Sequence, residues 1–342
     1  MKFKLLGVNT EHVVNIGDYI QALAASQFLP TIDGFIQREN LRDYKGEECK
    51  MIMNGWFMHN PVQWPPSEKI HPLFVSFHLN TLAKETLTNP QSIAYFKRFE
   101  PIGCRDIYTR DLLLKHGVDA YFSGCLTLTL GSRYKSESRE NEVYFVDPYF
   151  ATKRSINNIL KNIFSLLLHY RTISAIAKKY PSGKNGIRIK MKLVTFFREY
   201  RKYFSDEVLK NATYICHQSV YYKNNFPDDK ALLNEAERLV RLYSKAKLVV
   251  TSRIHCALPC LGLETPVIYI EKTKQNSANS CRMGGLAELF TTMQWSEGGL
   301  YANFERKGKI SLTENIPSNK NTWKNLASKL IEIVEERLLN DK

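Results

Sequence analysis

Along the first third of the chain, apolar runs typical of strands alternate with segments that have helical spacing. The strand-like runs are "FKLLGV", "CKMIMNG", "LFVSFH", "PIGCRD" and "AYFSGCLTLTL". The segments "DYIQALAASQFL" and "TRDLLLKHG" have the pattern of helices. Strands that alternate with helices predict a parallel sheet covered on both faces. We therefore expect an α/β domain over residues 1–133.

The same pattern restarts after a polar stretch at residues 134–141, which we interpret as a linker. The runs "EVYFVD", "ATYICHQS", "KLVVTS" and "PVIYI" predict the strands of a second α/β unit over residues 142–305. Between them, "LLNEAERLVRLYSKA" predicts a helix whose apolar face is formed by Leu232, Ala236, Leu239, Val240 and Tyr243. Another amphipathic helix is expected within residues 315–342. A length of 342 residues also favours two domains.

Composition places the chain among ordinary globular proteins and excludes several classes. Hydrophobic residues make up 44%, and no run of about 18 apolar residues could span a bilayer. Polar residues interrupt the N-terminal apolar run before a secretory signal could form, so we expect a cytoplasmic protein. Seven cysteines without a CxxC pair predict reduced, buried thiols. Because GxGxxG, HExxH and DxD motifs are absent from the sequence, we expect no metal and no bound cofactor.

Positive charge is concentrated in one segment, residues 151–204. The chain has a net charge of +14, and this segment contributes thirteen Lys or Arg and one acid, or +12. We expect it to be a helical insert in the second domain. Its apolar stripe consists of Ile159, Ile163, Leu166, Leu167, Tyr170 and Ile173, with Lys161, Arg171, Lys178 and Lys179 around or beyond it. One interpretation is docking on an anionic membrane surface. The alternative is a stripe packed on the second domain, with the cations in solvent.

The stretch "TSRIHCALPCLGLETPVIYI" indicates strand, turn, helix, loop and strand. Ser252, Arg253 and His255 follow the carboxyl end of the predicted strand, where α/β proteins bind ligands. Arg253 and His255 face the same way only if the backbone stays extended through His255. In that case a guanidinium for an anion lies beside a group suited to proton transfer. The alternative is a helix start, with Arg253 in a structural ion pair.

Three other strand ends carry candidate site residues. "NIGD" places Asn15, Gly17 and Asp18 after the first strand, either as a helix cap at Asp18 or as the wall of a cleft for a hydroxylated substrate. Arg105 in "GCRD" is an anion ligand or a partner of a neighbouring aspartate. His217 in "CHQS" shares a cleft with His255 or is a buried, hydrogen-bonded histidine.

Taken together, "NIGD", "GCRD", "FSGCLTLTL", "CHQS" and "TSRIHCALPCLGLETPVI" resemble the polysaccharide pyruvyl transferase family. The resemblance implies two Rossmann-like domains facing a central cleft, as in GT-B glycosyltransferases. It also implies transfer of a pyruvyl group from phosphoenolpyruvate to a sugar, as a ketal, on a polysaccharide or its lipid-linked precursor. On this basis the first domain is the acceptor side and the second the donor side. The resemblance implies that His255 is the acid/base and that the donor ligands are Arg253, Ser252, Arg105 and His217. The implied acceptor ligands are Asn15, Gly17 and Asp18.

Two other functions stay open from the sequence. A metal-independent glycosyltransferase of the same architecture would use a sugar nucleotide and ignore phosphoenolpyruvate. A basic nucleic-acid-binding protein would show salt-sensitive affinity without turnover, although we expect no nucleic-acid partner. For an enzyme acting on lipid-linked sugars, we expect a cytoplasmic location with peripheral attachment at the inner face of the cell membrane.

Overall fold

The first half of the chain is built around two parallel sheets. The computed structural model describes residues 1–8, 13–152, 155–181, 186–272 and 281–340. The first sheet has the order β3-β1-β4-β6, with β1 (Lys2–Gly7), β3 (Phe35–Gln37), β4 (Cys49–Ile52) and β6 (Ile70–Leu73). The second has the order β5-β7-β8-β9, with β5 (Gly55–Phe57), β7 (Phe77–Leu79), β8 (Ile102–Cys104) and β9 (Ala120–Phe122). Because β5 and β7 closely follow β4 and β6, the chain passes twice from one sheet into the next.

Helices accompany these strands as the alternating pattern predicts. They are α1 (Ile16–Ser26), α2 (Lys84–Leu87), α3 (Pro90–Lys97), α4 (Ile107–Lys115) and α5 (Gly131–Tyr134). The strand expected through the end of "FSGCLTLTL" is wrong beyond Phe122. Residues Leu126–Leu130 form a 3-10 helix, η4, in which the threonines are buried as fully as the leucines. Alternation of leucine and threonine therefore does not distinguish a strand from a 3-10 helix in this segment, where all five side chains are buried.

The second half contains one sheet of the order β11-β10-β13-β14-β15-β16, in which only the last pair is antiparallel. Its strands are β10 (Val143–Val146), β11 (Thr213–Ile215), β13 (Leu248–Thr251), β14 (Val267–Lys272), β15 (Thr291–Ser296) and β16 (Gly299–Ala302). In chain order the first five read 2-1-3-4-5, so the direction of winding reverses between β10 and β13. Ligands of such sheets bind at the carboxyl ends of the strands, at this reversal.

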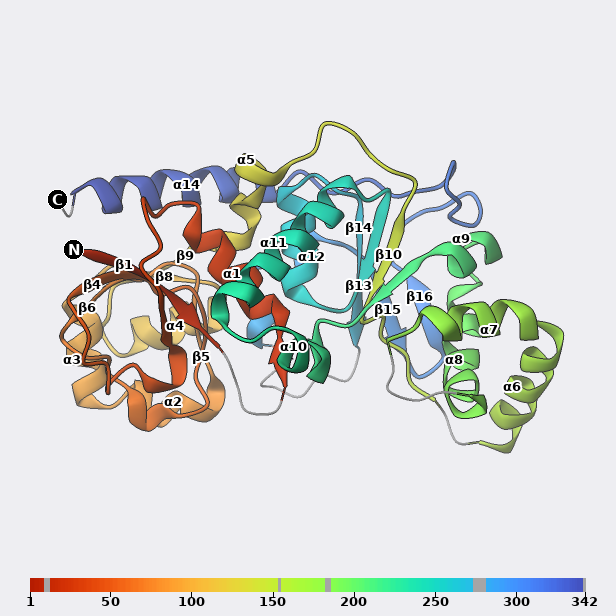
Figure 1. Cartoon of the computed structure of the whole chain (residues 1–342), viewed down its shortest axis with the longest axis horizontal. Helices are drawn as coiled ribbons and strands as arrows, with labels where there is room; N and C mark the ends of the chain where they lie inside the picture. The colour runs from red at the N-terminus through yellow and green to blue at the C-terminus, as the bar shows by residue number, and fades with distance from the viewer. Residues whose placement is uncertain (9–12, 153–154, 182–185, 273–280, 341–342) are drawn as a thin grey trace.

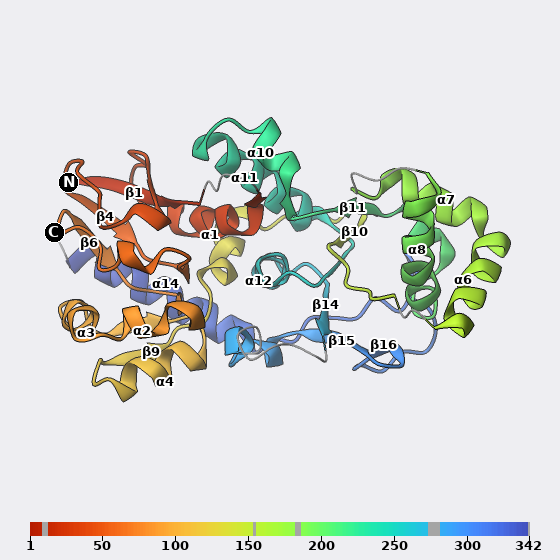
Figure 2. The ribbon, with the colours of Figure 1, turned by 90° about the horizontal axis from the view of Figure 1, so that it is seen from below.

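The basic segment forms a helical lobe at one end of the molecule, opposite the end where both chain termini lie (Figures 1 and 2). The lobe contains α6 (Ile156–Leu168), α7 (Tyr170–Lys179) and α8 (Ile187–Tyr200), followed by α9 (Asp206–Asn211). Phe196 and Tyr200 of α8 are fully buried in a cluster with Phe145 of β10. This packing fixes the lobe on the second sheet.

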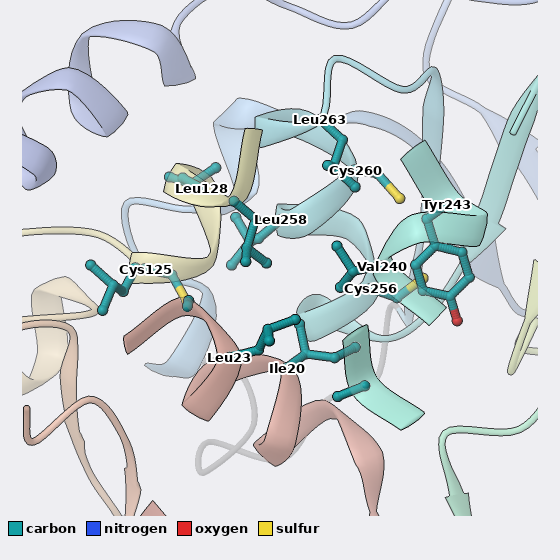
Figure 3. Packing of buried hydrophobic residues seen from close by; sticks show 14 of the residues in the cluster. Ile20, Leu23, Cys125, Leu128, Val240, Tyr243, Cys256, Leu258, Cys260 and Leu263 are labelled. Carbon is teal, nitrogen blue, oxygen red and sulfur yellow. The ribbon is translucent and has the colours of Figure 1, made fainter. Parts of the chain in front are cut away.

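The two halves share one hydrophobic core. Ile20 and Leu23 of α1 pack with Val240 and Tyr243 of α11 (Asp229–Lys245), with α12 (Ile254–Gly262) and with η4 (Figure 3). The last helix, α14 (Trp323–Asn340), lies within the expected residues 315–342 and returns to the first half, where Arg337 donates a hydrogen bond of 2.8 Å to the Pro101 carbonyl. The expectation of an α/β fold with parallel sheets is confirmed.

Candidate functional site

The segment "NIGD" joins the two halves at the start of α1. Strand β2 (Val14–Asn15) pairs antiparallel with β12 (Gln218–Ser219), and the Ile16 amide donates to the His217 carbonyl at 2.9 Å. The N-cap is Asn15, whose Oδ1 accepts from the Gly17 amide at 3.2 Å. The expectation of a cap at Asp18 is therefore wrong. Asp18 lies in the first turn and accepts hydrogen bonds from Asn15 and Gln21.

Gly17 allows two histidines to approach this helix. A Cβ placed on Gly17 would lie 3.1 Å from Cβ of His255, 3.2 Å from Oδ1 of Asn15 and 3.7 Å from Nδ1 of His217. These separations leave little space for a side chain. The structure thus brings Asn15, Gly17, His217 and His255 together at the start of α1, although His217 itself is a buried, hydrogen-bonded histidine, which was one of its two alternatives.

The Arg253 and His255 side chains do not face the same way. The backbone is extended at Arg253 (φ −101°, ψ 121°), but at His255 it is not (φ −82°, ψ 17°), because α12 begins at Ile254. The expectation of an extended turn through His255 is wrong for this reason. His255 is buried, and its Nε2 lies 3.4 Å from Nη1 of Arg105 in the first half.

Arg105 is a fully buried cation with unused donors. Its Nη1 also donates to Oε1 of Gln21 at 3.4 Å, and its Nε lies 3.9 Å from the Asp106 carboxylate. Burial acts to raise the pKa of Asp106, but hydrogen bonding and the charges of His78 and Arg105 outweigh it and lower that pKa. Among the described residues, Nε and Nη2 of Arg105 have no hydrogen-bond partner. Buried polar groups are normally paired, so these donors suit a small anion.

Arg253 belongs to a pocket of about 390 Å³ at the reversal point of the second sheet. Its Nε donates to the Asp147 carboxylate at 2.6 Å, and its Nη1 donates to Gln218 at 3.3 Å. Ser252 donates to the Asp147 carbonyl at 2.7 Å, so both residues fix the turn after β10. The volume falls within the range of small-molecule sites. A structural ion pair was one of the alternatives for Arg253; its partner is Asp147, and the pair lies on the pocket wall.

His217 is fully buried between this pocket and Gly17. Its amide donates to Asp147 at 3.0 Å, and its Nε2 lies 2.8 Å from the Tyr243 hydroxyl. Burial lowers the pKa of His217 to about 4, because the charged imidazolium is poorly solvated there. The side chain is therefore neutral at pH 7. Its Nδ1 has no hydrogen-bond partner among the described residues.

A small hollow on the first half contains Asp18. Its other walls include Gln21, Arg38, Asn54 and Trp56, with the Arg38 guanidinium 5.0 Å from the Trp56 ring centroid. Gln21 links this hollow to the buried arginine, since its amide donates to Asp18 at 3.1 Å while its carbonyl accepts from Arg105. Asn15 and Gly17 are not part of its wall.

A family model described as polysaccharide pyruvyl transferase matches residues 15–271 of the chain. The chain belongs to this family. The match includes every candidate residue from Asn15 to His255. As a member of this family, the protein is a transferase that acts in polysaccharide biosynthesis. No curated protein sequence matches the chain.

Two solved structures resemble this family member distantly. An uncharacterized protein from Klebsiella pneumoniae has 13% identity and a TM-score of 0.42, over 82% of this chain and 87% of that one. The E. coli heptosyltransferase WaaC with ADP has 11% identity and a TM-score of 0.34, over 98% of this chain and 100% of that one.

Sequence reasoning missed three polar residues of the candidate site. Lys272 and Lys192 line the pocket with Arg253, each close to an aromatic ring: Lys272 Nζ lies 4.4 Å from the Tyr149 ring centroid and Lys192 Nζ 5.6 Å from that of Phe150. Burial, then the charge of Arg253, lowers the pKa of Lys272. Lys272 follows the predicted strand "PVIYI" by two residues, so its position near a strand end was a usable signal. Lys192 and Gln21 lie within helices and gave none.

Proposed function

We propose that this protein transfers the pyruvyl group of phosphoenolpyruvate to two hydroxyls of one sugar, forming a ketal and releasing phosphate. The sugar belongs to a polysaccharide or to its lipid-linked precursor. Family membership supports the pyruvyl transfer. The observation that carries the proposal is the contact of His255 with Arg105, which puts a proton-transfer group beside a buried cation that has unused donors.

The two halves act as Rossmann-like units facing a shared site, in the manner of GT-B enzymes. The parallel sheets and the 2-1-3-4-5 strand order of the second unit support this arrangement. The first unit provides the hollow around Asp18, and the second provides the pocket around Arg253. Acceptor and donor therefore approach His255 from opposite units.

Phosphoenolpyruvate carries a carboxylate and a phosphate, so two groups of cations suit it. Arg253, Lys272 and Lys192 hold the phosphate in the pocket, because arginine and lysine both bind phosphate oxygens strongly. Arg105 donates to the carboxylate through Nε and Nη2, the two nitrogens without a hydrogen-bond partner among the described residues. Ser252 and His217 support the donor indirectly, through their hydrogen bonds to Asp147.

The chemistry requires one proton donor and stabilisation of negative charge on the leaving phosphate. His255 protonates C3 of the enol, so that the carbon–carbon double bond becomes a methyl group and C2 becomes electrophilic. One sugar hydroxyl adds to C2; the C2–O bond to phosphate then breaks, and the second hydroxyl adds. In sum, one hydroxyl proton ends on C3 and the other on phosphate. Proton transfer of this kind is worth about 10²–10⁴ in rate, and the cations stabilise the leaving phosphate.

On the acceptor side, Asp18 binds sugar hydroxyls at the protein surface, since the hollow beside it has a volume of about 10 Å³ and has no room for a sugar ring. Asn15 and Gly17 contribute by setting the first turn of α1, which places the carboxylate of Asp18. Gln21 then couples a sugar bound at Asp18 to Arg105. This chemistry needs no metal and no bound cofactor, and activity is expected to survive treatment with EDTA.

The test is phosphate release from phosphoenolpyruvate in the presence of a panel of simple and lipid-linked glycosides, with the ketal identified by NMR. His255→Gln and Arg105→Gln are expected to lose turnover by at least about a hundredfold. Arg110→Gln changes an arginine of α4 whose side chain pairs with the adjacent Asp111 and is the matched control. Turnover of a sugar nucleotide without any use of phosphoenolpyruvate would indicate the rival glycosyltransferase. Salt-sensitive nucleic-acid binding without turnover would indicate the other rival.

A further inference from the structure

Helix α6 presents its apolar side chains to solvent. Seven large hydrophobic side chains of this helix are between 44% and 78% exposed: Ile156, Ile159, Leu160, Ile163, Phe164, Leu167 and Leu168. Successive members are separated alternately by three positions and by one position, which puts them along one stripe of the helix. The sequence had placed Leu166 and Ile173 in such a stripe, but both are buried. We call the seven exposed residues the α6 face.

Polar contacts fix the orientation of α6. The buried Asn162 donates to Oγ1 of Thr195 at 3.3 Å and accepts from Arg198 at 2.6 Å, both on α8. Leu166, one turn after Asn162 on the same side of the helix, packs in the hydrophobic cluster that contains Phe145, Phe196 and Tyr200. The polar Asn162 therefore points inward and the apolar stripe outward, which is the reverse of a helix on a water-facing surface.

The lobe that carries the α6 face is rich in exposed cations, and no acid lies near this face in the sequence. Lys161, Arg171 and Arg188 are exposed on α6, α7 and α8, and the sequence contains no Asp or Glu from Pro148 to Arg198. The exposed Tyr170 carries Lys190 4.2 Å from its ring centroid, and Ile187 beside it in the lobe is also exposed. An exposed apolar stripe with basic and aromatic residues at its border is typical of helices that lie in a lipid headgroup layer.

We propose that the α6 face docks this protein on an anionic lipid surface. Apolar side chains enter the acyl boundary, while lysines and arginines contact anionic headgroups. A second copy of the chain is a poor occupant, because pairing two such faces would bring two strongly basic lobes together. Among the described residues no helix is long and apolar enough to cross a bilayer, so the attachment is peripheral. The proposal does not depend on the reaction assigned above.

The test is co-sedimentation of the full chain with vesicles. One set contains phosphatidylcholine alone, and the other also contains phosphatidylglycerol. The wild type is expected to bind the anionic vesicles only, and added salt weakens that binding. The double variant Leu160→Gln, Phe164→Gln is expected to lose about tenfold or more in binding. Leu82→Gln, which changes an 88% exposed leucine in the first half, is the matched control and should bind like the wild type.

Circular dichroism and thermal unfolding verify that the double variant is folded, which is expected because both side chains are already exposed. Lack of binding to either vesicle at low salt would overturn the proposal. So would equal binding by the double variant. Light scattering on the same samples would reveal a dimer abolished by the double variant, and that result would assign the α6 face to a second copy instead of a lipid surface.

Discussion

Acidification should destabilise this protein through His217. The imidazole is fully buried against Tyr243, and burial lowers its pKa from the ordinary 6.5 to about 4. Between these values the unfolded chain binds a proton that the folded chain excludes. The free energy of unfolding therefore falls as the pH drops from about 6.5 towards 4, and the stabilisation is fully present only above this window.

The size of the effect follows from the two pKa values. A group with pKa 6.5 when unfolded and about 4 when folded contributes about 2 kcal/mol less to folding at pH 5 than at pH 7. Solvent does not reduce this free-energy difference by screening, since the His217 side chain has no exposed surface. In His217→Gln this contribution disappears, so the difference in stability between the two pH values should shrink by that amount.

Urea unfolding at pH 7 and at pH 5 measures this difference directly. His217→Gln will lower stability at pH 7, because the contact with Tyr243 changes, and the comparison between pH values separates that loss from the proton linkage. His116→Gln, at an exposed side chain, controls for the removal of one imidazole. An unchanged pH dependence in His217→Gln would show that His217 is not the buried neutral base inferred from its contacts.

Three other predictions concern the donor pocket, the acceptor side and the packing of the two halves. Arg253→Lys should weaken phosphoenolpyruvate binding in a titration by about 1–3 kcal/mol, since an ammonium cannot replace the planar fork; unchanged affinity would remove Arg253 from the site. Asp18→Ala should raise KM for the sugar more than KM for phosphoenolpyruvate, whereas a loss of thermal stability with normal kinetics would assign Asp18 to helix α1 alone. Gly131→Ala should lower the free energy of unfolding by about 1–3 kcal/mol, because the new Cβ would lie 1.9 Å from the Gly262 carbonyl oxygen. Gly284→Ala, with its nearest contact at 3.5 Å, is the control, and equal stability of the two variants would contradict the argument.

The sequence predicted those parts of the fold that local periodicity determines. The five apolar positions predicted for one face of α11, from Leu232 to Tyr243, are all buried. The strand, turn and helix around Arg253 also match β13 and α12. In these segments burial and exposure alternate with the period of the helix or strand, so the hydrophobic pattern alone is sufficient to predict the element.

Contacts between distant segments were not predictable in the same way. Lys192 lines the pocket of Arg253 because α8 packs on the second sheet, and no pattern in the sequence predicts that contact. Periodicity showed that α6 has an apolar stripe, but the pairing of Asn162 with Thr195 and Arg198 decides which side faces outward. On α6 the buried hydrogen bonds of Asn162 therefore determine the orientation of the helix, against the usual preference of apolar side chains for the interior.

Arg253 and His255 are separated by one residue, and the change of backbone conformation between them explains why they contact different parts of the candidate site. Arg253 is still extended and contacts Asp147 at the end of β10, inside the second half. His255 lies beyond the helix start and meets Arg105 of the first half. The first turn of α12 therefore connects the donor pocket to the buried cation. A ligand that displaces Asp147 from Arg253 would act on the same turn that positions His255, so under the proposed function donor binding would affect proton transfer through this turn.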